Sequence, residues 1–114
     1  IRLFSEWGLV EYLISALDRG VHIAGMSAGA LALSSWYIHE DNDVFEIRKG
    51  WGIAPVGALV HANQDSFGKA KSLWADLHRD NKCSFVAIGE SAAWRISTSG
   101  EQKIGSGDIW RMDC

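Results

Sequence analysis

The chain has 114 residues, 47% of them hydrophobic, and a formal net charge of −3, which excludes an intrinsically disordered polypeptide. Acidic and basic residues alternate without a Lys- or Arg-rich block, and no apolar run approaches the ~20 residues that span a membrane, so neither nucleic acid nor a membrane is an expected partner. Two widely separated cysteines, Cys83 and Cys114, fit neither a disulfide framework nor a metal site, and we expect one cytoplasmic domain over residues 1–114 with reduced thiols and no metal.

The first third of the chain contains two predicted helices with a short predicted strand between them. Residues Glu6–Arg19 predict an amphipathic helix, because apolar side chains recur at helical spacing at Val10, Leu13, Ile14 and Leu17. The apolar run Val21–Ala24 predicts a short strand. The Ala- and Leu-rich run Ala28–Tyr37 has no internal breaker and predicts the second helix.

The middle of the chain alternates a loop, a strand and a helix. The polar segment His39–Gly50 predicts a loop, with a short strand at Val44–Ile47 as an option. The run VGALVHA that follows Pro55 predicts a buried strand. Residues Ser66–Arg79 predict a helix whose apolar face consists of Phe67, Ala70, Trp74 and Leu77.

The last third of the chain is typical of strands. The apolar run SFVAIGE ends in an acid and predicts a strand buried on both faces. The segments AAWRIST, EQKIGSG and DIWRMDC predict short antiparallel strands separated by Gly and Ser turns. Because helices and strands alternate before this tail, the sequence predicts an α/β fold with a mostly parallel sheet and flanking helices.

The five residues Gly25–Gly29 read G-M-S-A-G and fit the G-x-S-x-G nucleophile elbow. In such an elbow a sharp turn from strand to helix raises a serine hydroxyl above the sheet edge, and the small neighbours relieve the crowding. Ser27 is therefore the candidate nucleophile, and the backbone N–H of Ala28 is a candidate oxyanion donor. The structural alternative is a plain tight turn, but the apolar run before the motif and the helical run after it favour catalysis.

A nucleophilic serine needs a base, and His61 is the best placed of the four histidines. It ends the run GALVH, and the carboxyl ends of parallel strands form the edge where sites gather. A packed structural histidine is the alternative for this position. The other histidines are expected inside the strand before the elbow, at the end of the elbow helix and near the end of a later helix: His22, His39 and His78.

The base in turn needs an acid to orient it, and two positions are candidates. Glu90 follows the apolar run FVAIG, so it is expected at the same sheet edge as Ser27 and His61. Asp43 lies in the polar loop and is the alternative acid. Each of these carboxylates is also compatible with an ordinary solvated surface position.

These motifs together resemble peptidase family S51, the dipeptidase E and cyanophycinase group of serine peptidases. GMSAGA places Ser27 on the family's nucleophile, GWGIAPVGALVH places His61 on its base, and VAIGESAAWRI places Glu90 on its acid. An alternative assignment within the family takes the acid from the loop after the elbow helix, where Asp43 is the nearest match. The resemblance extends from about Leu3 to the C-terminus.

The resemblance implies a three-layer α/β fold of the class I glutamine amidotransferase-like or flavodoxin-like kind. The family domain is longer than this chain, and its N-terminal part carries the first strands and a second oxyanion donor. Because the chain also begins with Ile rather than Met, we expect it to be the C-terminal part of such a domain, with a sheet that is incomplete at its N-terminal side.

The implied activity is hydrolysis of small peptides through a Ser-His-Glu triad, without a cofactor and with Asp-containing peptides as one substrate option. Dipeptidase E has an arginine-containing stretch after the histidine that helps to hold an acidic substrate. This chain has ANQDSFGKAKS instead, with Lys69 and Lys71 as the only cations, and on a helix both are expected to be solvated.

Three other functions stay open. A related class I amidotransferase-like domain could bind a ligand without turnover, although the catalytic members of that group use cysteine where this chain has Ser27. An esterase could use the same triad. The chain could also be an inactive fragment with an unpaired sheet edge, and a homodimer is left open.

Overall fold

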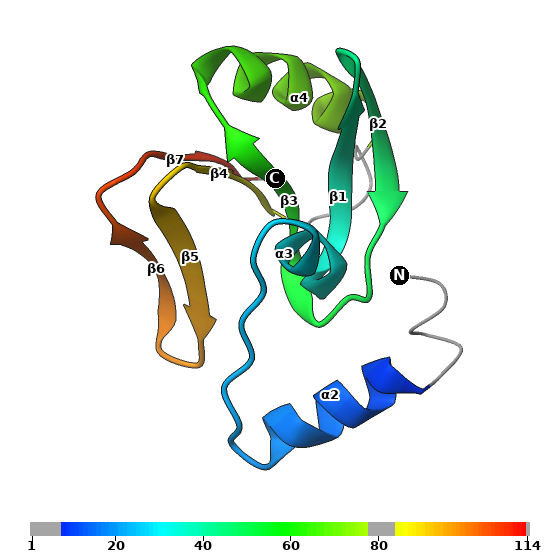
Figure 1. Cartoon of the computed structure of the whole chain (residues 1–114), viewed down its shortest axis with the longest axis vertical. Coiled ribbons are helices and arrows are strands. Elements are labelled where there is room, and N and C mark those ends of the chain that lie inside the picture. The colour runs from blue at the N-terminus through cyan, green and yellow to red at the C-terminus, as the bar shows by residue number, and fades with distance from the viewer. Residues whose placement is uncertain (1–7, 78–83, 114) are drawn as a thin grey trace.

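A computed structural model describes residues 8–77 and 84–113, and these residues form a five-stranded sheet and a two-stranded sheet (Figure 1). The strand order in the larger sheet is β2-β1-β3-β4-β7. Its strands are β1 (Ser34–Asp41), β2 (Val44–Lys49), β3 (Ala54–Ala62), β4 (Ser84–Gly89) and β7 (Ile109–Met112). The smaller sheet pairs β5 (Ala92–Ser97) with β6 (Gly100–Gly105) in antiparallel fashion. The predicted α/β fold and the predicted strands of the C-terminal third are confirmed.

The larger sheet is mixed, so the prediction of a mostly parallel sheet is only partly correct. β1, β3 and β4 are parallel to one another and form its centre. β2 and β7 are antiparallel to their neighbours and form its edges. The central parallel strands end at one edge of the sheet, which is the arrangement that the site prediction requires.

The segment predicted as a loop over residues 39–50 is instead a β-hairpin. β1 continues to Asp41 and β2 begins at Val44, so the optional strand at Val44–Ile47 is confirmed and is longer than expected. Asn42 and Asp43 form the two-residue turn with φ values of 49° and 63°. Asn and Asp tolerate this left-handed conformation, which two-residue hairpin turns need; these turn formers were assigned to a loop and not to a hairpin.

The helix predicted over Ala28–Tyr37 ends early, at Leu33, so this prediction is wrong for its second half. Helix α3 (Ala28–Leu33) stops where the Ser34 hydroxyl, at 1% exposure, donates a hydrogen bond of 2.6 Å to the Leu31 carbonyl. The aromatic and branched residues that follow favour a strand, and Trp36 pairs with Gly57 of β3. Pairing with a central strand therefore outweighs the local helix propensity.

The strand predicted over Val21–Ala24 is not formed. Residues 21–26 have no regular secondary structure, and in the described part of the chain no strand pairs with them. A segment without a partner strand forms no ladder hydrogen bonds and is not a strand, whatever its propensity, and the Val21 N–H donates to the Ala16 carbonyl of α2 instead. Half of the Val21 surface is exposed, which agrees with this interpretation.

The first predicted helix is present, but its apolar face is not packed. Helix α2 (Leu9–Asp18) has a buried Ala16, whereas Ile14 and Leu17 are 45% and 41% exposed. In Figure 1 the helix stands apart from the sheets and is connected to them by the extended segment that leads to α3. The amphipathic pattern therefore predicted the helix correctly. It also predicted an apolar face packed against other elements, and within the described residues Ile14 and Leu17 of that face are exposed.

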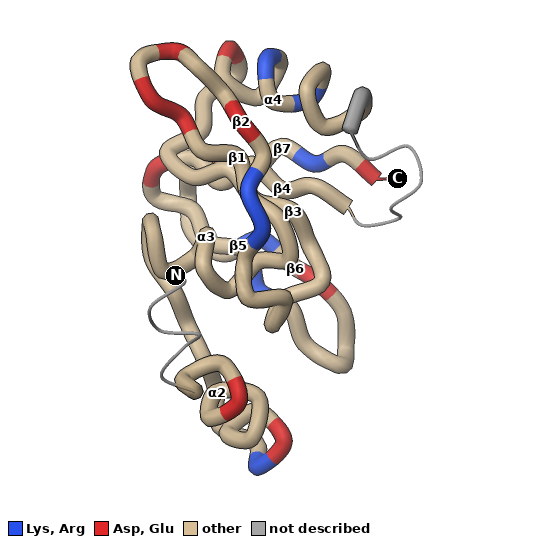
Figure 2. The backbone as a smooth tube through the Cα atoms, turned by 90° about the vertical axis from the view of Figure 1, so that its right-hand side faces the viewer, with Lys and Arg blue, Asp and Glu red and all other residues tan. Residues whose placement is uncertain are grey.

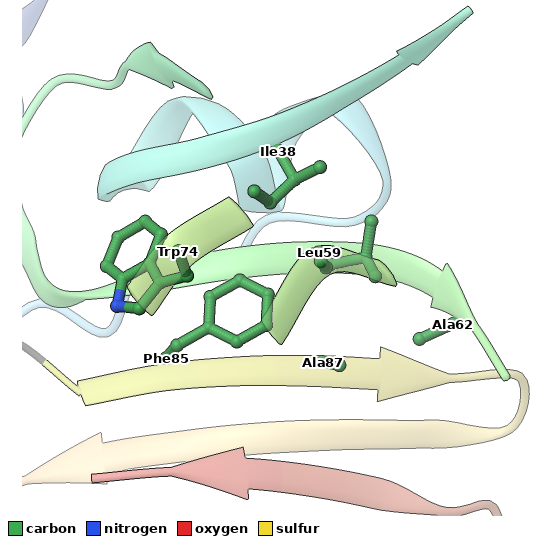
Figure 3. Close-up of a cluster of buried hydrophobic side chains, with 7 residues drawn as sticks. Ile38, Leu59, Ala62, Trp74, Phe85 and Ala87 are labelled. Carbon is green, nitrogen blue, oxygen red and sulfur yellow. The ribbon is translucent and has the colours of Figure 1, made fainter. Parts of the chain in front are cut away.

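Helix α4 (Gln64–Leu77) covers the sheet as predicted and supplies the centre of the core. Trp74 is 1% exposed and its ring centroid lies 5.1 Å from that of Phe85, whose side chain is fully buried (Figure 3). Ala70 of the predicted face is also buried and Phe67 is half-buried. The side chain of Leu77 lies outside the described residues. The core therefore anchors β3 and β4, the two strands that lead to the predicted base and acid.

The charges are spread over the molecule rather than collected in one place. Figure 2 shows Lys and Arg residues on β2, α4, β7 and the end of α2, with acidic residues between them. On the edge strand β2, a hydrogen bond from Arg48 to Glu46 raises the pKa of the guanidinium. None of the described helices is both long enough and apolar enough to cross a membrane.

Candidate active site

Ser27 lies in the sharp turn that leads into α3. Its φ and ψ angles are 54° and −117°, a conformation that is rare for a residue with a side chain and typical of a nucleophile elbow. Its carbonyl accepts the helical hydrogen bond from Leu31, so the helix begins directly after it. A Cβ atom on Gly25 would lie 2.5 Å from the Gly29 backbone, which explains why the turn needs glycine at the first motif position.

His61 lies near the end of β3, within an irregularity of the ladder between β3 and β4. Leu59 pairs with Ala87, whereas Ala62 pairs with Gly89, so β3 has one more residue than β4 between these pairs. This extra residue makes a β-bulge, and His61 has a φ of 51°. Bulges redirect side chains, and the His61 side chain at this one is exposed.

Glu90 directly follows β4, as predicted, and begins the bend that leads to β5. Ser91 beside it has a φ of 59°. The bend is held by a hydrogen bond of 2.9 Å from the Gly107 N–H to the Ser91 carbonyl. The carboxylate therefore sits on a constrained turn at the carboxyl end of a buried strand.

These three side chains form a continuous line of hydrogen bonds. Ser27 Oγ lies 3.1 Å from Nε2 of His61, and Nδ1 of the same ring lies 2.6 Å from Oε1 of Glu90. The line is open to solvent, because the side chains of His61 and Glu90 are 63% and 78% exposed. A hydroxyl, an imidazole and a carboxylate in this order can deprotonate the hydroxyl and keep the imidazole in one tautomer.

The alternative acid, Asp43, is not part of this line. It lies in the turn between β1 and β2, and within residues 8–77 and 84–113 it forms no hydrogen bond or ion pair with His61. His22 is exposed in the segment before the elbow, and His39 lies in β1 opposite Glu46, so neither takes the place that was expected for it. His78, Cys83 and Cys114 lie outside the described residues.

The two lysines considered as substrate clamps are both exposed on α4. Lys69 forms an ion pair of 3.5 Å with Asp65, one helical turn away. Lys71 is exposed as well. Their solvation was predicted, and nothing in their contacts directs them toward Ser27. Over the described ranges, no group of three or more His, Cys, Asp or Glu side chains is arranged to hold a metal ion.

Two supporting features of the site were missed in the sequence. Asn63 and Ser66 form a reciprocal cap at the start of α4, with Ser66 N–H donating to Asn63 Oδ1 at 2.8 Å and Asn63 N–H donating to Ser66 Oγ at 2.9 Å. The spacing Asn-x-x-Ser directly after a strand was the signal for it. The second feature is the contact of the Gly105–Asp108 turn with the residues beside Glu90: a Gly and Ser turn was predicted here, but its place next to the acid was not.

A comparison with protein-family models shows to which family the chain belongs. The model of peptidase family S51 matches residues 1–104, which is most of the chain. The chain belongs to peptidase family S51. The resemblance stated from its motifs is thereby confirmed, and membership supports a peptidase, hence a hydrolase. The searches of curated proteins and of solved structures found no match.

For this S51 member, the family match and the geometry concern the same residues. The elbow, the bulge of β3 and the end of β4 all lie inside the matched range. The Gly105–Asp108 turn lies just beyond it. Beyond the motifs, the structure therefore shows the backbone features that hold each side chain: the elbow, the bulge of β3 and the bend after β4.

Proposed function

We propose that this S51 peptidase is a serine peptidase that hydrolyses small peptides, with Ser27 as the nucleophile, His61 as the general base and Glu90 as the orienting acid. The observation that carries the proposal is the unbroken line of hydrogen bonds, 3.1 Å from Ser27 to His61 and 2.6 Å from His61 to Glu90. The sequence motifs name the same three residues that this line of hydrogen bonds joins.

In the first half of the proposed reaction, Ser27 Oγ attacks the carbonyl carbon of the scissile peptide bond while Nε2 of His61 takes the hydroxyl proton. The tetrahedral intermediate then collapses, the C–N bond breaks, and His61 gives the proton to the leaving amine. This leaves the acyl group joined to Ser27 Oγ as an ester. In the second half, His61 removes a proton from water, and the resulting hydroxide attacks the carbonyl carbon of this ester. The bond from that carbon to Ser27 Oγ then breaks, the acid product leaves, and His61 returns the proton to Ser27.

Glu90 and the backbone at Ala28 have supporting roles in this proposal. The Glu90 carboxylate accepts a hydrogen bond from Nδ1, which keeps Nε2 free to accept the serine proton and offsets the charge of the imidazolium. Ala28 is the first residue of α3, so its N–H lies next to Ser27 and is a proposed oxyanion donor. No cofactor takes part in any of these steps.

The exposure of the site favours one second candidate, a chain with an assembled triad and weak activity by itself. Electrostatic stabilisation of an oxyanion is strongest where water is excluded, and the His61 and Glu90 side chains are mostly exposed. Such a chain would be a part of a larger S51 domain with little or no activity by itself, and that domain would have the class I amidotransferase-like layering that the resemblance implies. Ligand binding without turnover would be a related outcome.

A fluorophosphonate probe tests the proposal, because it labels an activated serine and spares ordinary ones. The wild-type chain is expected to be labelled, and Ser27→Ala is expected to abolish labelling. Ser72→Ala is the matched control, since Ser72 is an exposed serine on α4 whose only described hydrogen bond is a long one to Gly68. Absence of labelling in the folded wild-type chain would favour the second candidate.

Substrate class needs a separate measurement, with turnover of an Asp-containing dipeptide compared with that of a simple ester. The peptidase proposal expects the dipeptide to be hydrolysed, and preference for the ester would make the chain an esterase. The exposed positions of Lys69 and Lys71 do not favour a strong requirement for aspartate, so we expect a neutral dipeptide to be hydrolysed as well.

A further inference from the structure

The two sheets share a single hairpin, and Glu90 lies at the point where it bends. Ile88 of β4 faces Ile109 of β7, and Ala92 of β5 faces Gly105 of β6. Three residues lie between these pairs on each side, Gly89–Ser91 and Ser106–Asp108, so Glu90 and Gly107 are the middle residues of the two connections. Figure 1 shows the connection between β4 and β5 running beside the connection between β6 and β7.

The connection between β6 and β7 is hydrogen-bonded to the connection between β4 and β5 through the backbone. The Gly107 N–H donates to the Ser91 carbonyl at 2.9 Å, and the Gly89 N–H donates to the Asp108 carbonyl at 3.0 Å. Nζ of Lys103 donates to the Gly107 carbonyl at 3.0 Å and ties the turn to β6. The residues on both sides of Glu90 are thus bonded to the same four-residue turn, 105–108.

This close approach requires glycine. A Cβ atom on Gly107 would overlap the Glu90 carbonyl oxygen and would lie 2.9 Å from the carbonyl carbons of Glu90 and Ser91. Gly105 has a φ of 95°, and a Cβ atom there would overlap the Ser91 carbonyl oxygen. In both cases the obstacle is backbone rather than the end of a flexible side chain, so an added methyl group must displace the bend itself.

We propose that Gly107 is a positioning residue for Glu90, because its lack of a side chain lets the hairpin bend far enough to bring the carboxylate to His61. The inference rests on the proposed function insofar as Glu90 orients the base. A shift of about 1 Å in a positioned group can lower a rate by about 10²-fold, and the 2.6 Å contact with Nδ1 leaves little room for such a shift. Gly107 lies beyond residue 104, where the family-model match ends.

The test is Gly107→Ala in the full chain, with two readouts. The first is the low-field proton NMR resonance of the His61 Nδ1–H hydrogen-bonded to Glu90, which requires no turnover. The second is the rate at which the fluorophosphonate labels Ser27. We expect the resonance to disappear and labelling to slow by about 10²-fold. Gly68→Ala is the matched control, because a Cβ atom on Gly68 of α4 meets nothing within 4 Å, and both readouts should equal those of the wild type.

A double substitution separates positioning from general damage to the fold. In a Glu90→Gln background, Gly107→Ala should slow labelling little further, because the group it positions is already disabled. A full additional loss in that background would show that Gly107 acts through the fold and would overturn the proposal. Far-UV circular dichroism and thermal unfolding of each variant verify that the chain is folded.

If Gly107→Ala does not fold, Lys103→Met provides the test, because it removes the bond to the Gly107 carbonyl without adding bulk beside Glu90. We then expect a weaker resonance and a smaller loss of labelling rate. If the variants keep the wild-type Nδ1–H resonance and the wild-type labelling rate, the role of Gly107 is overturned and the proposed function is unaffected.

If the wild-type chain is not labelled, the proposed function is contradicted. The effect of the variants on the Nδ1–H resonance of His61 then still decides the role of Gly107.

Discussion

Ser27 and His61 are hydrogen-bonded to each other although both have a left-handed φ, 54° for the serine and 51° for the histidine. Each conformation costs of order 1–3 kcal/mol and persists only where the surrounding structure enforces it. The elbow enforces the first and the bulge of β3 enforces the second. Two separate irregularities thus bring the side chains of Ser27 and His61 together, which supports the proposed catalytic roles of these residues.

The elbow leads to a prediction that separates its two glycines. Gly25→Ala should lower the free energy of unfolding by about 1–3 kcal/mol, because the new methyl group meets the Gly29 backbone at 2.5 Å. Gly29→Ala should be neutral or stabilising by up to about 1 kcal/mol, since a Cβ atom there meets nothing and the residue is helical. Urea unfolding of both variants measures the difference, and equal losses would contradict the steric account.

The choice of acid is tested by a matched pair of neutral substitutions. Glu90→Gln should lower the labelling rate and peptide turnover by up to about 10⁴-fold, because an amide does not hold the His61 ring in the tautomer that accepts the serine proton. Asp43→Asn should leave both unchanged, since Asp43 lies in the turn between β1 and β2 away from the hydrogen-bonded line. The reverse outcome would assign the role to Asp43 and remove Glu90 from the mechanism.

The fold was predictable from sequence where periodicity and burial agree. The apolar face of α4 and the continuous apolar run of β4 predicted elements that the structure confirms. Prediction failed where a partner strand decides the outcome. Residues after Leu33 became β1 because β3 lies beside them, and Val21–Ala24 did not become a strand because none lies beside it in the described structure. Propensity contains no information on such pairings.

The three side chains of the candidate site were predictable from the sequence, but the backbone features that position them were not. Ser27, His61 and Glu90 each follow a recognisable apolar run, and the rule that parallel strands end at one edge predicted the meeting of His61 and Glu90, which follow β3 and β4. Ser27 contacts His61 although the strand predicted before it is not formed. Their catalytic roles stay a prediction until the variants are measured. The bulge at His61 and the contact of Gly107 with Glu90 depend on register between distant strands, which local sequence does not specify.

The cap of α4 gives a prediction on stability close to the site. Asn63→Ala should destabilise the chain by about 1 kcal/mol, because the Ser66 N–H loses its acceptor at the start of the helix. Asn63→Asp keeps an acceptor, adds a negative charge at the helix N-terminus, and should recover most of that loss. Thermal unfolding midpoints of the three proteins measure the effect, and an unchanged midpoint for Asn63→Ala would show that the cap contributes nothing.

The last prediction concerns the core that holds the base and the acid at one edge. Gly57 of β3 faces the Trp74 ring so closely that a Cβ atom on Gly57 would overlap it, with Cζ2 and Cζ3 at 2.6 and 2.7 Å. Gly57→Ala alone should cost about 1–3 kcal/mol of stability through overpacking. Trp74→Phe alone should cost a similar amount, because the smaller ring leaves a cavity where a 1%-exposed side chain was packed.

Together the two substitutions should cost less than the sum of their separate effects, because the new methyl group occupies part of the space that the smaller ring vacates. The expected coupling is about 0.5–3 kcal/mol, measured by a double-mutant cycle in urea. Additive losses would show that the two positions do not share this space and would contradict the steric account of the β3–α4 contact.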